Sequence, residues 1–123
     1  MPPGVNVVAV EGDDRLSARA VLATVGRMRS SDVVLVEGGP QLLGDFFAES
    51  CVDEQFLTVS PQVVGRDGSH ERPGFVAGKT FAPGHPVWGT LISVKRGGNH
   101  LFLRYAFSGS DSPHNSQPEE ASA

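Results

Sequence analysis

The sequence predicts an α/β fold in one small domain. Short β-branched segments alternate with segments of helical periodicity along the first half of the chain, and the joints between them are short. This alternation is typical of right-handed crossovers that join parallel strands. The length of 123 residues allows a single domain, and a hydrophobic content of 39% is enough to form its core.

The first predicted strand and helix lie near the N-terminus. Val5–Val10 (VNVVAV) is uncharged and β-branched, which predicts a buried strand. Ser17 is a favourable N-cap for the helix that follows, because its hydroxyl can accept a hydrogen bond from a free amide of the first turn. Apolar residues recur along this helix at helical spacing, which indicates a core-facing stripe, at Val21, Val25 and Met28.

A second strand and helix and then a third strand come next. Val33–Val36 (VVLV) predicts another buried strand. Pro40 suits the first turn of a helix, where a missing amide hydrogen costs nothing, and the helix is expected at about Gln41 to Glu49. Gln55–Val59 is the third predicted strand. We therefore expect three parallel strands connected by two crossover helices.

The C-terminal half has a different pattern. Residues 66–88 are rich in glycine, proline, histidine and charged residues, which predicts a long surface loop. Thr90–Lys95 and Leu101–Phe107 are apolar segments joined by a glycine-containing turn, which is typical of an antiparallel hairpin. Ser108–Ala123 contains almost nothing apolar. We therefore expect a folded domain over residues 1–107 and a disordered tail over 108–123.

Composition narrows the classes of function. Three of the 14 acidic residues lie in 108–123, and the remaining 11 nearly balance the 10 basic residues. The chain outside 108–123 is therefore nearly neutral. A protein without a broad region of positive charge is not expected to bind nucleic acid. No apolar run approaches the roughly 20 residues of a membrane span, and the opening MPPG is unlike a signal peptide, so we expect a cytoplasmic protein with no membrane partner. The four histidines have no other ligand type at metal-binding spacing, and no metal site is expected.

The joint between Val33–Val36 and the next helix is the best candidate for a ligand site. Ligands of parallel sheets lie beyond the carboxyl ends of the strands, where Glu37 would project. Gly38 and Gly39 let the backbone approach a ligand closely, and the helix N-terminus offers free amides to a phosphate. A tight turn that uses glycine only for its geometry explains the same residues. The joint has neither the GxGxxG fingerprint nor a P-loop lysine.

Longer stretches of the chain carry a more specific signal. Residues 33–47 read VVLVEGGPQLLGDFF, followed by VDE at 52–54 and SPQVVG at 60–65. From about Val5 to Phe107 the chain resembles the RibD C-terminal family, the reductase domain of bacterial riboflavin biosynthesis and a relative of dihydrofolate reductase. The resemblance implies a partial dihydrofolate-reductase-like mixed sheet, with three parallel strands, two crossover helices and a C-terminal antiparallel hairpin.

The resemblance also implies an activity. In this family NADPH delivers a hydride to the ribosyl carbon of 5-amino-6-(5-phosphoribosylamino)uracil, so we expect an oxidoreductase that acts on this compound or a related pyrimidine or pterin. Glu37 matches the family's substrate-contacting acid, and the paired glycines beside it resemble a glycine pair that is cis in dihydrofolate reductases. The residues that match the NADPH-binding turn and helix start are Gly38, Gly39, Pro40, Gln41, Leu42, Leu43, Gly44 and Asp45.

Against the family pattern, we expect this sequence to lack the family's first strand and the loops that hold the substrate. The alternative function is therefore a truncated, non-catalytic nucleotide-binding or assembly module. The deaminase signature of bifunctional relatives is also absent from the sequence. Uncovered strand edges, together with the dimers common in the family, predict a homodimer.

Overall fold

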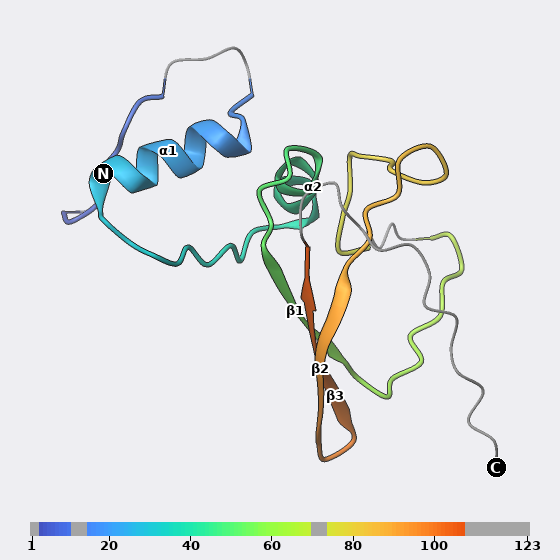
Figure 1. Cartoon of the computed structure of the whole chain (residues 1–123). Helices are drawn as coiled ribbons and strands as arrows, with labels where there is room; N and C mark the ends of the chain where they lie inside the picture. Colours follow the sequence, from blue (N-terminus) through green and yellow to red (C-terminus); the bar gives the residue numbers. More distant parts are fainter. Residues whose placement is uncertain (1–2, 11–14, 70–73, 108–123) are drawn as a thin grey trace. The chain divides into compact units, whose positions relative to one another are not determined.

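The computed structural model describes residues 3–10, 15–69 and 74–107, which form two compact units. The helical unit consists of the chain up to Cys51 together with Arg66–Thr80, and it holds both helices of the described residues. The sheet unit consists of Val52–Gly65 and the chain from Phe81 onward, and it holds the three strands. Figure 1 shows these elements along the chain.

Helix α1 (Ala18–Met28) begins where the sequence predicts. The Ser17 hydroxyl accepts a hydrogen bond from the amide of Ala20 at 3.1 Å, so the predicted N-cap is confirmed. Thr24 is buried, and its hydroxyl donates to the carbonyl of Ala20 at 2.9 Å. Two members of the predicted apolar stripe are half-buried and the third is exposed, in the order Val21, Val25 and Met28.

Helix α2 (Pro40–Ala48) carries the core of the helical unit. Phe46 and Phe47 are only 2% and 8% exposed, and burial of each ring stabilises the unit by roughly 1.5–3 kcal/mol. Phe47 meets the ring of Phe75 edge-on, with 6.2 Å between the ring centroids. The helix predicted at about Gln41 to Glu49 is thus confirmed to within one residue at each end.

The sheet consists of β1 (Glu54–Val59), β2 (Thr90–Gly97) and β3 (His100–Ala106). Its order is β1-β3-β2, and both pairs of neighbours are antiparallel. The predicted C-terminal hairpin is therefore confirmed as β2 and β3. Gly98 in the hairpin turn has a φ of 57°, a left-handed conformation that glycine adopts at little cost.

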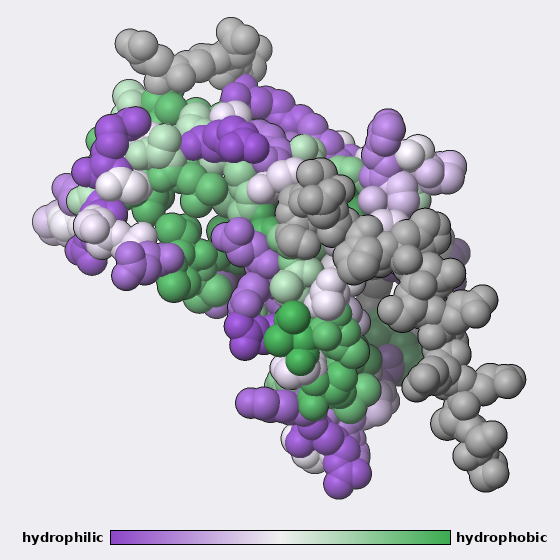
Figure 2. Space-filling view, in the orientation of Figure 1, coloured by the Kyte–Doolittle hydropathy of each residue, from purple (hydrophilic) through white to green (hydrophobic). Residues whose placement is uncertain are grey.

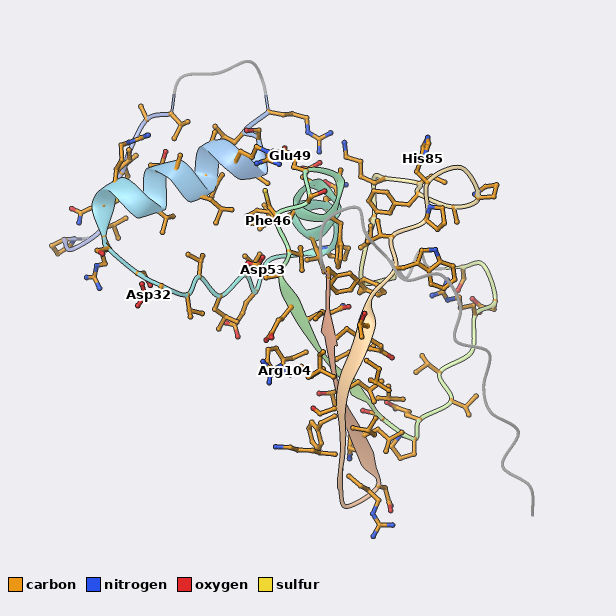
Figure 3. The ribbon with its side chains drawn as sticks, in the orientation of Figure 1. Asp32, Phe46, Glu49, Asp53, His85 and Arg104 are labelled. Carbon is orange, nitrogen blue, oxygen red and sulfur yellow. The ribbon has the colours of Figure 1, made fainter. Side chains whose placement is uncertain are left out.

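A cross-strand ion pair on the sheet joins Glu54 to Arg104, which is labelled in Figure 3. The guanidinium donates to the carboxylate from Nε at 3.0 Å and from Nη2 at 2.5 Å, and it lies 5.6 Å from the centre of the Phe56 ring. The hydrogen bonds to Glu54 and the charge of its carboxylate raise the pKa of Arg104. Because both side chains are more than a third exposed, the pair adds little to stability.

The prediction of three parallel strands is wrong, since the sheet is three antiparallel strands. Val5–Val10 and Val33–Val36 are not strands, and neither pairs with a strand of the described residues. Gln55–Val59 is present within β1, but its partner is β3. A strand forms where its backbone groups find partners, and the hydrophobicity of a segment does not identify that partner. The α/β class with two helices is confirmed.

Two further predictions concern regions without regular structure. Residues 66–88 contain neither helix nor strand in the part that the structure describes, as expected for a surface loop. The predicted disordered tail, 108–123, lies outside the described residues. The domain over 1–107 stays a prediction.

Many large apolar side chains are exposed on both units. Figure 2 shows hydrophobic residues gathered over the strands on the visible face. The exposed apolar side chains of the described residues include Phe56 of β1 and Leu91 and Val94 of β2, as well as Val33 and Leu35 of the helical unit. Extended apolar surface of this kind commonly marks a site of association.

Candidate functional site

The joint before α2 leaves two backbone donors at the start of the helix. Gly39 is the N-cap, and its carbonyl accepts from the amide of Leu43 at 3.1 Å, but glycine offers no side-chain cap. Pro40 at the first helical position has no amide hydrogen. The amides of Gln41 and Leu42 have no hydrogen-bond acceptor among the described residues. These two N–H groups are therefore available to a ligand.

The two glycines of the joint have different surroundings. A side chain at Gly39 would meet nothing within 4 Å, so the space in front of the helix start is open. A side chain at Gly38 would overlap Cδ2 of Leu42, which lies over it. Gly38 therefore makes room for the packing of Leu42, whereas Gly39 leaves room for a group from outside the helix. The Gly38–Gly39 peptide is trans, so the cis pair expected from dihydrofolate reductases is wrong here; the cis bond in the described residues is Ala82–Pro83.

The charge around the start of α2 favours an anion. The first turn of the helix contains no acidic residue that would offset the positive end of the helix dipole. Glu37 is exposed and makes no hydrogen bond or ion pair within the described residues. Asp45, one turn further along, is flanked by Arg15 at 3.2 Å and Lys79 at 3.5 Å, so its charge is balanced locally.

Helix α1 differs from α2 in this respect. Its first amides donate hydrogen bonds to side chains. The amide of Ala20 donates to the Ser17 hydroxyl, and the amides of Ala18 and Arg19 donate to the Glu49 carboxylate, both at 3.0 Å. Figure 3 shows Glu49 at the end of α2, beside the first turn of α1. The start of α1 is therefore satisfied by protein groups, and the start of α2 is not.

Several predicted site residues have structural roles on the other side of α2. Gly44 is buried, and a Cβ there would lie 2.6 Å from the carbonyl oxygen of Ala77. The amide of Ala77 in turn donates to the carbonyl of Pro40 at 3.0 Å, which holds the loop against the helix. Leu43 is half-buried. At the helix start itself, Gly39, Gln41 and Leu42 are exposed and Pro40 is half-buried, and the exposed Glu37 precedes them.

Sequence reasoning missed the side chains that come from outside the joint. Arg15 and Lys79 at Asp45, and Glu49 at the start of α1, lie 30 or more residues from their partners. No local pattern marks such pairs. Among the described residues there is also no group of three or more His, Cys, Asp or Glu side chains placed to hold a metal ion. No helix in that part of the chain is long and apolar enough to cross a membrane.

Comparison with known families identifies the class of protein. The family model of the RibD C-terminal domain matches residues 4–93, which is most of the chain. The chain belongs to this family. It is thus a domain of the reductase type found in the riboflavin pathway, and the family generally binds NADPH. In a comparison with curated proteins, none matched.

Proposed function

We propose that the chain binds NADPH, with a phosphate group at the start of α2, and reduces 5-amino-6-(5-phosphoribosylamino)uracil or a related pyrimidine or pterin. Family membership supports the reaction class. The observation that carries the proposal is the uncapped start of α2, with its two available amides.

The chemistry of the helix start fits a phosphate. The N-terminus of a helix behaves as about half a positive charge, and here no acid of the first turn opposes it. The amides of Gln41 and Leu42 supply two donors, and the missing side chain of Gly39 lets an anion approach the backbone. A phosphate of NADPH has the charge and the acceptor oxygens that this arrangement requires.

Glu37 is proposed to hold the second substrate beside the cofactor. When bound, NADPH would supply the hydride that reduces the ribosyl carbon; the bond from this carbon to the ring oxygen breaks, and the oxygen takes up a proton, which leaves an open ribityl chain. An ionised carboxylate only accepts hydrogen bonds, so Glu37 would orient the pyrimidine or its sugar through their N–H or O–H groups. Its position, two residues before the N-cap of α2, puts it next to the proposed phosphate site in the chain.

Two substitutions separate cofactor binding from substrate binding in calorimetric titrations. Gly39→Val fills the open space in front of the helix and should abolish NADPH binding, because its side chain occupies the place of the phosphate. Glu37→Gln removes the charge but keeps the shape, so it should leave NADPH affinity unchanged and weaken binding of the pyrimidine. Equal NADPH affinity in wild type and Gly39→Val would contradict the proposed site.

A non-catalytic nucleotide-binding module is the second candidate function. Reduction of the sugar carbon requires a proton as well as a hydride. Glu37 makes no ion pair or hydrogen bond with another titratable group among the described residues, and this favours the non-catalytic module. The two functions differ in turnover. NADPH oxidation that depends on the pyrimidine supports the reductase, whereas NADPH binding without oxidation supports the module.

A further inference from the structure

Two cationic side chains meet beside α2, at the carboxylate of Asp45. The ammonium of Lys79 lies 3.5 Å from Oδ1 of Asp45, and the Arg15 guanidinium donates from Nη2 to Oδ2 at 3.2 Å. All three residues belong to the helical unit. Because two positive charges face one negative charge, this cluster of Arg15, Asp45 and Lys79 is positive overall.

The cations of the cluster are more accessible than its carboxylate. The side chain of Asp45 is 19% exposed, compared with 38% for Lys79 and 68% for Arg15. Neither cation makes a further ion pair or side-chain hydrogen bond among the described residues. An ammonium has three N–H donors and a guanidinium has five. Each cation therefore keeps donors that an anion from solvent can reach.

The cluster lies about one helical turn from the available amides at the start of α2. Gln41 and Asp45 are four residues apart, which puts them on the same face of the helix and about 6 Å apart along its axis. The loop that carries Lys79 runs beside this part of the helix. A Cβ at Gly78 would lie 3.9 Å from Cγ of Gln41, and a Cβ at Gly44 would lie 3.3 Å from Cγ of Lys79. The amides and the cations are therefore close enough for one ligand to contact both.

The backbone just before Lys79 is fixed on α2. The amide of Ala77 donates to the carbonyl of Pro40 at 3.0 Å, and the ring of Phe75 packs edge-on against that of Phe47. Binding costs less when the groups that contact a ligand are ordered beforehand. Lys79 needs little ordering beyond its own side chain to contact a ligand bound to this helix.

We propose that Lys79 and Arg15 bind the 2′-phosphate of a nucleotide whose 5′-linked phosphate lies at the start of α2. This inference rests on the proposed function, because NADPH carries both phosphates on its adenosine ribose. A phosphate monoester has about −1.5 to −2 charges at neutral pH and accepts charge-assisted hydrogen bonds, whereas the 2′-hydroxyl of NADH is uncharged. The two cations therefore make the site prefer NADPH to NADH.

Two small nucleotides separate the two phosphate contacts in calorimetric titrations at physiological ionic strength. Adenosine 5′-monophosphate carries only the phosphate assigned to the helix start, and adenosine 2′,5′-bisphosphate carries both. The wild-type chain should bind the bisphosphate at least about tenfold more tightly. Lys79→Gln should weaken binding of the bisphosphate at least about fivefold and change the affinity for the monophosphate by less than about twofold, because salt screens exposed charges. Arg15→Gln should act in the same direction.

The matched controls are exposed cations outside the cluster. Lys95→Gln lies in the sheet unit and Arg66→Gln in the helical unit, and neither should alter the affinity for either nucleotide. Exposed ion pairs add little to stability, so the Lys79 and Arg15 variants should stay folded, as circular dichroism can verify.

The possible outcomes distinguish this proposal from the proposed function. Equal wild-type affinity for the two nucleotides, or an equal loss of both in Lys79→Gln, would overturn the assignment of the 2′-phosphate and leave the helix start as a phosphate site. Monophosphate binding that persists unchanged in Gly39→Val would instead contradict the proposed function. Absence of binding by either nucleotide would overturn both.

Discussion

Glu49, just after α2, caps α1 through its contacts with Arg19. Its Oε2 accepts a hydrogen bond from the amide of Arg19 at 3.0 Å, and its Oε1 accepts from the amide of Ala18 at the same distance. The Arg19 guanidinium returns a hydrogen bond to the Glu49 carbonyl at 2.8 Å. The negative charge also lies at the positive end of the α1 dipole. One residue therefore joins the two helices of this unit.

Removal of this cap should destabilise the helical unit. Glu49→Ala leaves two amides of α1 without their acceptor, and we expect a loss of about 1–2 kcal/mol in the free energy of unfolding. Urea denaturation followed by circular dichroism measures the change. The control is Glu37→Ala, which removes an exposed carboxylate that makes no hydrogen bond or ion pair among the described residues. Equal stability of the two variants would show that the cap contributes nothing.

Two glycine-to-alanine substitutions should have effects of opposite sign. Gly44→Ala places a Cβ 2.6 Å from the backbone oxygen of Ala77, and the shift that it forces should cost about 1–3 kcal/mol. Gly26→Ala, inside α1, meets nothing within 4 Å and should stabilise by about 0.5–1 kcal/mol, because alanine favours the helix. Thermal unfolding of both variants checks the signs. A neutral Gly44→Ala would mean that the loop at Ala77 does not pack closely on α2.

The turn at Asp67 contributes to the stability of the folded state, and the sign of its pH dependence follows from the pKa of Asp67. The Ser69 hydroxyl and amide donate to the Asp67 carboxylate at 2.6 and 2.9 Å, and these hydrogen bonds hold the pKa of Asp67 below its ordinary value of 3.8. A carboxyl with a lowered pKa in the folded state stabilises that state above its ordinary pKa, and the contribution is lost as the pH falls through the lowered value.

Ser69→Ala removes the hydrogen bond from the hydroxyl, which is the largest cause of the lowered pKa, and should move the pKa of Asp67 back toward 3.8. An NMR titration of the Asp67 side chain between pH 2 and 6, roughly two units either side of an ordinary aspartate pKa, measures the shift. Ser31→Ala is the control, because the Ser31 hydroxyl donates to the carbonyl of Val33 and does not touch Asp67. An unchanged titration in Ser69→Ala would show that the hydroxyl does not bind the carboxylate in solution.

The helices and the hairpin could be predicted because their signals are local. The Ser17 hydroxyl caps α1 by a hydrogen bond from the amide only three residues further along. Pro40 is the first residue of α2, and the turn at Gly98 joins two strands that are adjacent in the chain. The parallel sheet was a wrong prediction because strand pairing is not local. Between β1 and β3 lie 40 residues, and the hydrophobicity of β1 is equally compatible with a parallel neighbour.

In the candidate site, too, local features could be predicted from the sequence and non-local contacts could not. The pattern of Glu37, Gly38 and Gly39 before a proline located the helix start whose amides remain available. The reason that Gly44 must be glycine is the approach of Ala77, which lies in a loop 33 residues further along the chain. Contacts of this kind depend on how the loop packs, and a motif read along one segment does not contain them.

The most direct test of the proposed cofactor site is an NMR titration of the backbone amides with NADPH. We expect saturable shifts at Gln41 and Leu42, and none at Ala18 and Arg19, whose amides are already bonded to Glu49. Gly39→Val should abolish the shifts without unfolding the helix, because the extended backbone of residue 39 (φ −72°) accepts any side chain. Absent shifts at millimolar NADPH, or shifts that persist in Gly39→Val, would contradict the assignment of this helix start as the phosphate site.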